Sequence, residues 1–402
     1  MPLPSSDVPS LHLRDARLPD GSRGTVVVRD GVIAQREGDP PDAIPEEGPP
    51  RTLDLDGALL LPAPVDTHLH LDKTFFGGPW PSHEPEADSV RGRVAYERRR
   101  RHATDRPVRT RAEALLRHLI AQGTTALRTH ADVDDDVELS HVEALLDLRE
   151  AYADRVDMEV VAFPQSGVTA CPGAADLLDA AMDAGADLVG GLDPQSFSPG
   201  EAAEQMDVVF DLAERHDAGI DIHLHDAGRA GNAQLREIAA RTAARGLEGR
   251  VAVSHAFSLG DPAAQIDFAA TAEALARADV HIITSVPGRS HVPPVKPLRK
   301  AGVTVAAGSD NIRDAWSPLG TGDMLERALF LARRQGYRRD ADLRLAYDVC
   351  STGGAAVMGR PERRLEPGAP ADLVAVDAET VGDALARRPE RRCVIHEGRI
   401  VA

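Results

Sequence analysis

The sequence predicts an α/β fold, a (β/α)8 TIM barrel with a small β-sandwich built from both termini. Apolar runs alternate with helical patterns through the middle of the chain, and short β-branched segments occur near both ends. Such alternation is typical of a parallel sheet covered by helices. A chain of 402 residues accommodates a smaller module beside one barrel, which commonly takes about 250 residues. We therefore expect an N-terminal sandwich segment, a barrel and a C-terminal sandwich segment, over residues 1–60, 61–360 and 361–402.

The sandwich is predicted from short segments at the two ends of the chain. Near the N-terminus, Asp-Gly dipeptides at residues 20–21 and 30–31 lie between β-branched runs, which indicates hairpins. A Pro- and Glu-rich stretch at residues 39–50 is typical of an exposed loop. Near the C-terminus, residues 371–377 and 392–401 have strand patterns. Because neither end has enough strands to bury a face alone, we expect the two ends to pair.

The barrel is predicted from apolar runs that follow one another along the chain. Residues 58–63 form the first run, and an arginine-rich helical stretch over residues 89–122 follows it. Further runs occupy residues 124–130, 158–165, 186–193, 219–226, 250–255, 280–285 and 303–310, with helical patterns such as 202–215 and 262–278 between them. With the first run this makes eight, the number that closes a (β/α)8 barrel. The basic run at residues 98–101 is interpreted as a solvated helix face.

Polar residues collect where these predicted strands end. His68 and His70 are two residues apart, so both imidazoles project to one face of an extended strand. They are followed at later strand ends by His130, Asp132, Gln165, Asp193, His223, His225, Asp226, His255, Asp310 and Asn311. This rim carries the catalytic groups of TIM barrels, and imidazole is the commonest metal ligand in proteins. Packed core histidines are the alternative for any one position, but the recurrence on several strands favours a metal site.

Composition excludes several classes of partner. The formal net charge of −18 disfavours nucleic acid and anionic membranes, because both need a basic surface. The three cysteines have no paired spacing, so neither a disulfide framework nor a cysteine metal site is expected. No apolar stretch approaches about 18 residues, and the first residues lack a signal pattern. We expect a cytoplasmic protein with a small-molecule partner.

The chain resembles the amidohydrolase superfamily, within it the cytosine deaminase-like branch, and most closely the N-isopropylammelide isopropylamidohydrolase type. The resemblance rests on His68, His70, His223, His255 and Asp310, with β segments at both termini. It extends to longer motifs at residues 70–73, 128–132, 161–167, 187–194 and 309–316. It therefore covers nearly the whole chain.

The resemblance implies that His68, His70, His223 and Asp310 bind one divalent metal ion. Members with two metal ions usually bridge them through a modified lysine on the fourth strand, and residues 188–193 contain no lysine. Zinc suits three histidines and one aspartate best, and iron and manganese accept the same ligands.

The resemblance also implies hydrolysis of an exocyclic C–N bond, by deamination or dealkylamination, in a small oxo-substituted N-heterocycle. A bound metal ion lowers the pKa of water to about 7. Asp310 is then expected to act as general base and acid, and His255 to stabilise developing charge. The expected substrate-binding residues are Lys73, Gln165, Asp226, Asn311 and Trp316.

Three of these positions depart from cytosine deaminases, which carry Glu in place of Asp226, Asp in place of Asn311 and Thr in place of Lys73. Cytosine deaminase proper and a hydrolase of a cyclic amide or N-acyl substrate therefore stay open as alternatives, with a non-catalytic barrel subunit as a remote one. Lys73 either contacts substrate or forms a structural ion pair with Asp72 or Asp226. The number of subunits, including a homo-oligomer, also stays open.

Overall fold

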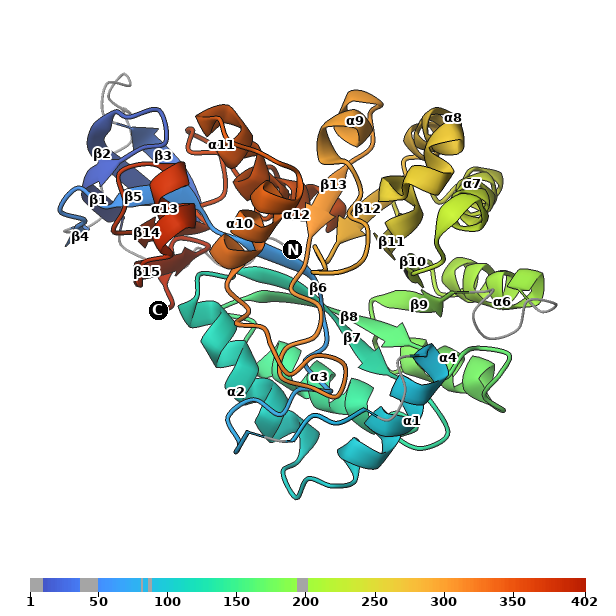
Figure 1. Cartoon of the computed structure of the whole chain (residues 1–402). Helices are drawn as coiled ribbons and strands as arrows, with labels where there is room; N and C mark the ends of the chain where they lie inside the picture. Colours follow the sequence, from blue (N-terminus) through green and yellow to red (C-terminus); the bar gives the residue numbers. More distant parts are fainter. Residues whose placement is uncertain (1–9, 37–49, 81, 86–88, 194–201) are drawn as a thin grey trace.

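The computed structural model describes residues 10–36, 50–80, 82–85, 89–193 and 202–402 (Figure 1). Within these ranges, eight parallel strands follow one another around the sheet in chain order. They are β6 (Val65–Leu69), β7 (Ala126–Asp132), β8 (Asp157–Phe163), β9 (Leu188–Leu192), β10 (Gly219–Leu224), β11 (Val251–His255), β12 (His281–Thr284) and β13 (Val305–Ala307). The predicted barrel is confirmed.

The ring closes between β6 and the segment after β13. The backbone N–H of Asp310 donates to the carbonyl of His68 at 2.7 Å, and Leu69 and Asp310 form a parallel bridge. At Gly308 a Cβ atom would lie 2.4 Å from the His68 carbonyl oxygen. Only glycine allows so close an approach between these two backbones. Barrel closure therefore brings the end of β13 directly against the first histidine.

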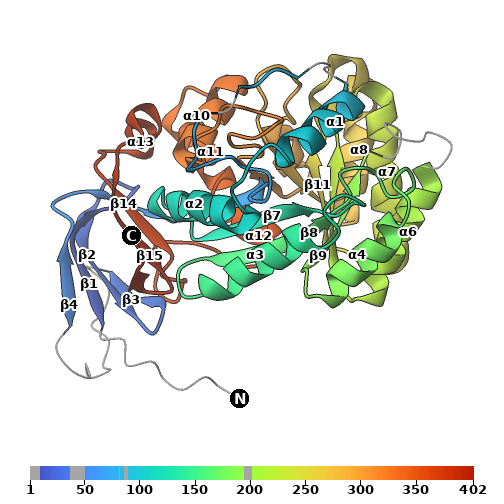
Figure 2. The same cartoon turned by 90° about the horizontal axis from the view of Figure 1, so that it is seen from below.

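Helices cover the outside of the barrel (Figures 1 and 2). The helices of the described ranges are α1 (Val90–Arg101), α2 (Val108–Ala121), α3 (Ser140–Ala151), α4 (Ala174–Asp183), α6 (Ala202–Arg215), α7 (Gly228–Arg245), α8 (Gln265–Arg277), α9 (Val295–Lys300), α10 (Met324–Arg334), α11 (Asp340–Val349), α12 (Thr352–Val357) and α13 (Val381–Arg387), with 3₁₀ turns at Phe257–Gly260 and Pro262–Ala264. In α10 the buried Leu325, Ala328 and Leu331 recur at helical spacing, which places one apolar face on the core.

The helical stretch expected over residues 89–122 is two helices. A helix running through this stretch would carry Pro107 in its interior, where proline supplies no N–H and clashes with the preceding turn. The structure places Pro107 at the N-cap of α2 instead. The chain changes direction between α1 and α2, which sets α1 apart from the outer ring (Figure 2).

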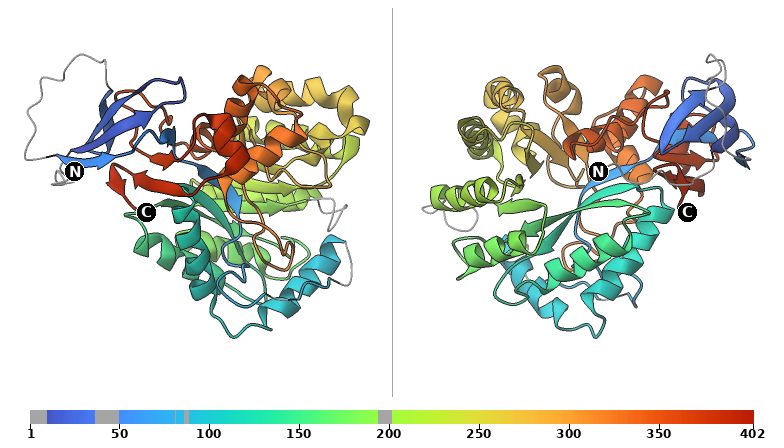
Figure 3. Two further views of the ribbon diagram at one scale, coloured as in Figure 1. Left: turned by 60° about the vertical axis from the view of Figure 1, so that its left-hand side comes forward. Right: turned by 180° about the vertical axis from the view of Figure 1, so that it is seen from behind.

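A second sheet joins both ends of the chain beside the barrel (Figure 3). Its order is β16-β15-β14-β5-β1-β2-β3, with β4 paired to β1. The strands are β1 (Leu11–Arg17), β2 (Arg23–Arg29), β3 (Val32–Arg36), β4 (Arg51–Asp54), β5 (Leu59–Pro62), β14 (Leu373–Val376), β15 (Arg391–His396) and β16 (Arg399–Ile400). This confirms the predicted β module built from both termini. Most of the predicted loop at 39–50 lies outside the described residues, and the segment boundaries at 60 and 360 stay predictions.

The apolar run at residues 58–63 is not the first barrel strand, so that expectation is wrong. It contains β5, which pairs antiparallel with β14 in the second sheet. Leu60 packs in the core of that sheet, whereas Leu59 and Leu61 pack in the barrel core. Burial on both faces explains why the run is continuously apolar. Pro62 and Pro64 supply no N–H for a ladder, and the barrel strand begins only at Val65.

None of the helices in the described ranges has both the length and the apolar composition needed to cross a membrane.

Arg363 joins the two sheets, and we predict that its loss destabilises the fold. Its buried guanidinium donates to the carbonyl of Ala63 at 2.9 Å and to Thr125 Oγ1 at 2.6 Å, and lies 3.4 Å from Asp372 Oδ2. Removing one partner of a buried ion pair typically costs about 3–5 kcal/mol. Arg363→Met is expected to lower the free energy of unfolding, measured by urea denaturation, by that amount.

The matched control is Arg364→Met. The Arg364 side chain is 54% exposed and pairs with glutamates on the surface, so a change within about 0.5 kcal/mol is expected. Equal destabilisation by the two substitutions would contradict the role of Arg363.

Candidate metal centre and substrate cavity

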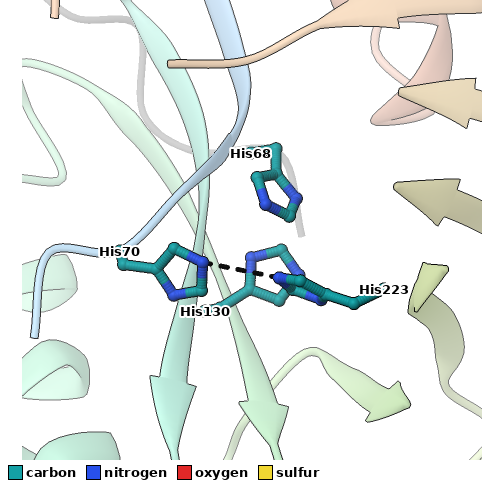
Figure 4. A group of neighbouring side chains, drawn as sticks. All are labelled: His68, His70, His130 and His223. Carbon is teal, nitrogen blue, oxygen red and sulfur yellow. Dashed lines mark hydrogen bonds between the residues drawn. The ribbon is translucent and has the colours of Figure 1, made fainter. Parts of the chain in front are cut away.

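Buried histidines from three strands meet inside the barrel (Figure 4). His68 lies in β6 and His70 directly follows that strand, so alternation along the strand turns both side chains inward. His130 comes from β7 and His223 from β10. The Nε2 atoms of His70 and His223 are 3.4 Å apart. The ring centroids of His68, His130 and His223 lie 4.4 to 4.6 Å from one another.

Asp310 and His255 complete this cluster from strand ends on the other side. Asp310 Oδ1 lies 3.5 Å from His68 Nε2 and 3.6 Å from His70 Nε2, and its Oδ2 lies 4.0 Å from His255 Nδ1. Asp310 has a φ of 61° and His255 a φ of 73°. Left-handed backbone at residues other than glycine is costly and is often retained at functional sites. At Asp310 and His255 this backbone conformation occurs where both side chains point toward the histidine cluster.

His70, His130, His223 and His255 are held neutral, which is the form of imidazole that ligates metals. Burial, which penalises the charged form, lowers the pKa of His70, His223 and His255 well below its ordinary value. It lowers the pKa of His130 to about 4. Burial opposes the ionisation of Asp310, but the neighbouring histidines outweigh it and hold its pKa well below the usual range. Neutral nitrogens therefore surround one carboxylate, as metal binding requires.

The hydrogen-bonding state of these residues fits a metal ion. Within the described ranges, both ring nitrogens of His68 and the Nδ1 atoms of His70 and His223 are buried without a hydrogen-bond partner. Leaving a buried polar atom unpaired costs about 1–3 kcal/mol, and a cation would satisfy some of these nitrogens. Imidazole and carboxylate ligands are those that zinc and similar divalent ions accept.

The structure brings together all four residues predicted as metal ligands. It adds His130, which sequence analysis placed at the rim without a role as ligand. His68, His70, His130 and His223 offer nitrogens that all lie within 4.8 Å of one another. His130 Nε2 is also 3.6 Å from Asp221 Oδ1, and Asp221 accepts from Arg128 and Ser254. His130 therefore connects the cluster to a polar network deeper in the barrel.

A cavity of about 1310 Å³ opens beside the histidine cluster. His70, His223, His255 and Asp310 contribute to its wall. Of the predicted substrate-binding residues, the cavity is lined by Gln165, Asn311 and Trp316. Their contact with substrate stays a prediction, but their location is consistent with it.

Lys73 lies behind the cavity wall. Its side chain is 1% exposed, and its Nζ lies 2.9 Å from Asp132 Oδ1 and 3.4 Å from Glu97 Oε1. Burial opposes the charge, but these carboxylates raise the pKa of Lys73 above its ordinary value. Lys73 also donates to Gln165 Oε1 at 2.5 Å. Its ion-pair partners are thus Asp132 and Glu97, rather than the aspartates considered from the sequence.

Asp226 is not among the described residues that line the cavity, although its neighbour in the chain, His225, is one of them. Its Oδ2 accepts a hydrogen bond of 2.5 Å from Gln234 Nε2 in α7. A substrate contact for Asp226 stays a prediction.

The basic run at 98–101 is only partly a solvated face, and for Arg101 that interpretation is wrong. The Arg101 side chain is 8% exposed, with Nη2 2.7 Å from Asp132 Oδ2 and Nη1 3.3 Å from Asp134 Oδ2. Glu97, one turn earlier in α1, reaches the same network. The acidic run at residues 132–136, directly after a predicted strand, is the sequence signal that matches this arginine. Nothing in the local pattern indicated Glu97.

Comparison with known proteins identifies the class of protein that this barrel and cluster define. The model of the amidohydrolase family, Amidohydro_3, matches residues 51–402, and the chain belongs to this family. Families of this kind are metal-dependent, in agreement with the His and Asp cluster.

Particular relatives are similar over almost their whole length. The chain is 33% identical to N-isopropylammelide isopropyl amidohydrolase of Pseudomonas sp. (strain ADP), over 87% of each chain. The crystal structure of N-isopropylammelide isopropylaminohydrolase from Burkholderia multivorans is 39% identical, with a TM-score of 0.91 and 98% of each chain covered. The 5-methylcytosine deaminase from Klebsiella pneumoniae, liganded with 5-fluorocytosine, is 26% identical, with a TM-score of 0.82 over 98% of this chain and 97% of that one.

We predict one equivalent of divalent metal per chain, removed by either His68→Ala or His223→Ala. Each substitution deletes a buried neutral nitrogen from the cluster, and loss of a ligand lowers affinity steeply. Elemental analysis of the purified proteins measures the number of metal equivalents per chain. His102→Ala, at a side chain 66% exposed, is the control that retains the metal. Two full equivalents in the wild type, or a full equivalent in His68→Ala, would contradict the assignment.

Proposed function

We propose that this amidohydrolase cleaves an exocyclic C–N bond of a small oxo-substituted N-heterocycle, by hydrolytic deamination or dealkylamination. The observation that carries the proposal is the convergence of Asp310 and His255 on the histidine cluster at the wall of the cavity. The proposal is supported by a carboxylate and an imidazole that lie side by side at the wall of a cavity. A cavity of about 1310 Å³ has room for a substituted ring.

We propose His68, His70, His223 and Asp310 as the ligands of one divalent ion, with zinc first and iron or manganese as alternatives. An ion held there would supply Lewis acidity and a nucleophile near neutral pH.

Asp310 is the proposed general base and acid. Its low pKa keeps it ionised, so it can accept the proton of the attacking water and pass it to the leaving amine. The hydrogen bond from the backbone N–H of Asp310 to the carbonyl of His68 holds Asp310 at the cavity wall.

His255 is proposed to stabilise the charge that develops on the ring. Its Nδ1 lies 3.1 Å from Ser285 Oγ, which fixes the ring and leaves Nε2 for the substrate. A neutral imidazole held by a second residue is suited to this task because it needs no reorganisation during the reaction.

Both an amino and an alkylamino leaving group are consistent with the relatives. One is named for removal of an isopropylamine, and another is a deaminase liganded with a pyrimidine. The large apolar side chains of Leu319 and Phe330 are 70% and 38% exposed, and both line the cavity. They support an alkylamino substituent, because such a group would cover apolar surface. Cytosine stays the second candidate substrate, favoured by the similarity to the pyrimidine deaminase.

We further propose a cytoplasmic location. Cys171, Cys350 and Cys393, all within the described residues, are free and buried, as is usual where thiols stay reduced.

Asp310→Asn is expected to lower kcat by about 10²- to 10⁴-fold, the usual cost of losing a general base. The substitution keeps the shape of the side chain, so the circular dichroism spectrum is expected to stay unchanged. Asp147→Asn, at an exposed position of α3, is the control. Wild-type turnover in Asp310→Asn, with metal still bound, would show that the assigned role is wrong.

A substrate panel tests the reaction itself. Metal-loaded protein is offered oxo-substituted azines that carry amino or alkylamino groups, together with cytosine and cyclic amides. Release of ammonia or alkylamine from the azines is expected, with little from cytosine. If ring opening of a cyclic amide is the main activity, the alternative function, hydrolysis of a cyclic amide, is favoured instead.

A further inference from the structure

A chain of side-chain contacts links the two amides that line the cavity. Gln165 Oε1 accepts from Lys73 Nζ, and Lys73 Nζ lies 3.4 Å from both oxygens of Glu97. Glu97 Oε2 in turn accepts a hydrogen bond of 2.5 Å from Trp316 Nε1. Glu97 is buried, and it accepts hydrogen bonds from both Lys73 and Trp316. It therefore couples two parts of the cavity wall that lie far apart in the sequence.

Asp314 continues the chain to the second amide. Its Oδ1 accepts from the backbone N–H groups of Trp316 and Ser317, each at 2.8 Å. Its Oδ2 accepts from Asn311 Nδ2 at 2.7 Å. The wall between Gln165 and Asn311 is thus held by contacts that run through two buried carboxyl groups.

The chemistry of the partners determines which way each amide faces. An ammonium group only donates, so Gln165 must present its carbonyl to Lys73. This leaves the Nε2 donors of Gln165 for the cavity. Burial raises the pKa of Asp314 to about 7. Above that pH its ionised carboxylate only accepts, so Asn311 presents its NH2 group to Asp314 Oδ2 and keeps its own Oδ1 for the cavity. Within the described residues, no protein group is hydrogen-bonded to Gln165 Nε2 or to Asn311 Oδ1.

Glu97 has the charge that this arrangement needs. Burial opposes its ionisation, but Lys73 and Arg101 outweigh this and hold its pKa below the ordinary value. An ionised Glu97 can accept from Lys73 and from Trp316 at once. A glutamine in its place has a single acceptor oxygen, and its NH2 group faces a donor.

We propose that Glu97 is a positioning residue that fixes the hydrogen-bond polarity of the substrate wall, with a donor at Gln165 and an acceptor at Asn311. The wall then selects heterocycles that turn an oxo group toward Gln165 and a ring N–H toward Asn311. This inference rests on the proposed function and names the substrate edge that the site recognises. Methylation of that ring nitrogen removes the donor and leaves the Asn311 acceptor unpaired, which is expected to lower kcat/KM about 10- to 100-fold.

Glu97→Gln, made in a Trp80→Phe background, tests the positioning role. The chain has two tryptophans, so Trp316 becomes the only one, and Trp80 is 61% exposed. We expect a shift in Trp316 emission and a KM raised at least 10-fold, with a smaller change in kcat and unchanged metal content. Glu143→Gln, at an exposed position of α3, is the matched control. Wild-type KM with unshifted emission in Glu97→Gln would overturn the proposal.

A second measurement does not depend on the variant folding. Wild-type enzyme is given an oxo-substituted aminoazine and its ring-N-methyl analogue, and equal kcat/KM values would overturn the proposed polarity. If no azine is hydrolysed, the proposed function fails. Calorimetric binding of the same two compounds then decides the polarity separately: tighter binding of the N–H compound supports it, and equal binding contradicts it.

Discussion

The backbone contact between Asp310 and His68 is the constraint on which the rest of the site depends. It closes the ring of strands, because the N–H of Asp310 donates to the His68 carbonyl. The same contact sets the Asp310 carboxylate 3.5 Å from the His68 ring. Gly308 permits it by having no side chain between the two backbones. Closure of the fold and assembly of the candidate metal centre are therefore one structural event.

The site concentrates features that cost stability. Unpaired buried nitrogens lie beside left-handed backbone at His255 and Asp310. Behind them, carboxylates and cations are buried together around Lys73. The surrounding barrel core of Val, Leu and Ile residues offsets these costs. The rigid strands therefore hold these nitrogens and charged groups in place, whereas in a more flexible structure they would move to form other hydrogen bonds.

Sequence analysis succeeded where the local pattern carries the structure. The barrel follows from alternating apolar runs. Strand-end positions placed His68, His70, His223 and Asp310 at one rim, and the family resemblance singled them out as a ligand set, which stays a prediction. Sequence analysis assigned residues 58–63 to the wrong sheet. A strand buried on both faces has the same continuous apolar pattern whether it belongs to the barrel or to the second sheet. Glu97 was missed for a different reason. Its partners lie 24 residues before it and 219 residues after it, and only the folded chain brings them together.

The central claim is that water attacks a ring carbon and an exocyclic amine leaves. Turnover in H2¹⁸O, followed by mass spectrometry of the product, tests this most directly. The account predicts one ¹⁸O atom in an intact ring, at the carbon that carried the nitrogen, with an equal amount of ammonia or alkylamine. An opened ring that retains the exocyclic nitrogen, or an intact ring without ¹⁸O, would contradict it.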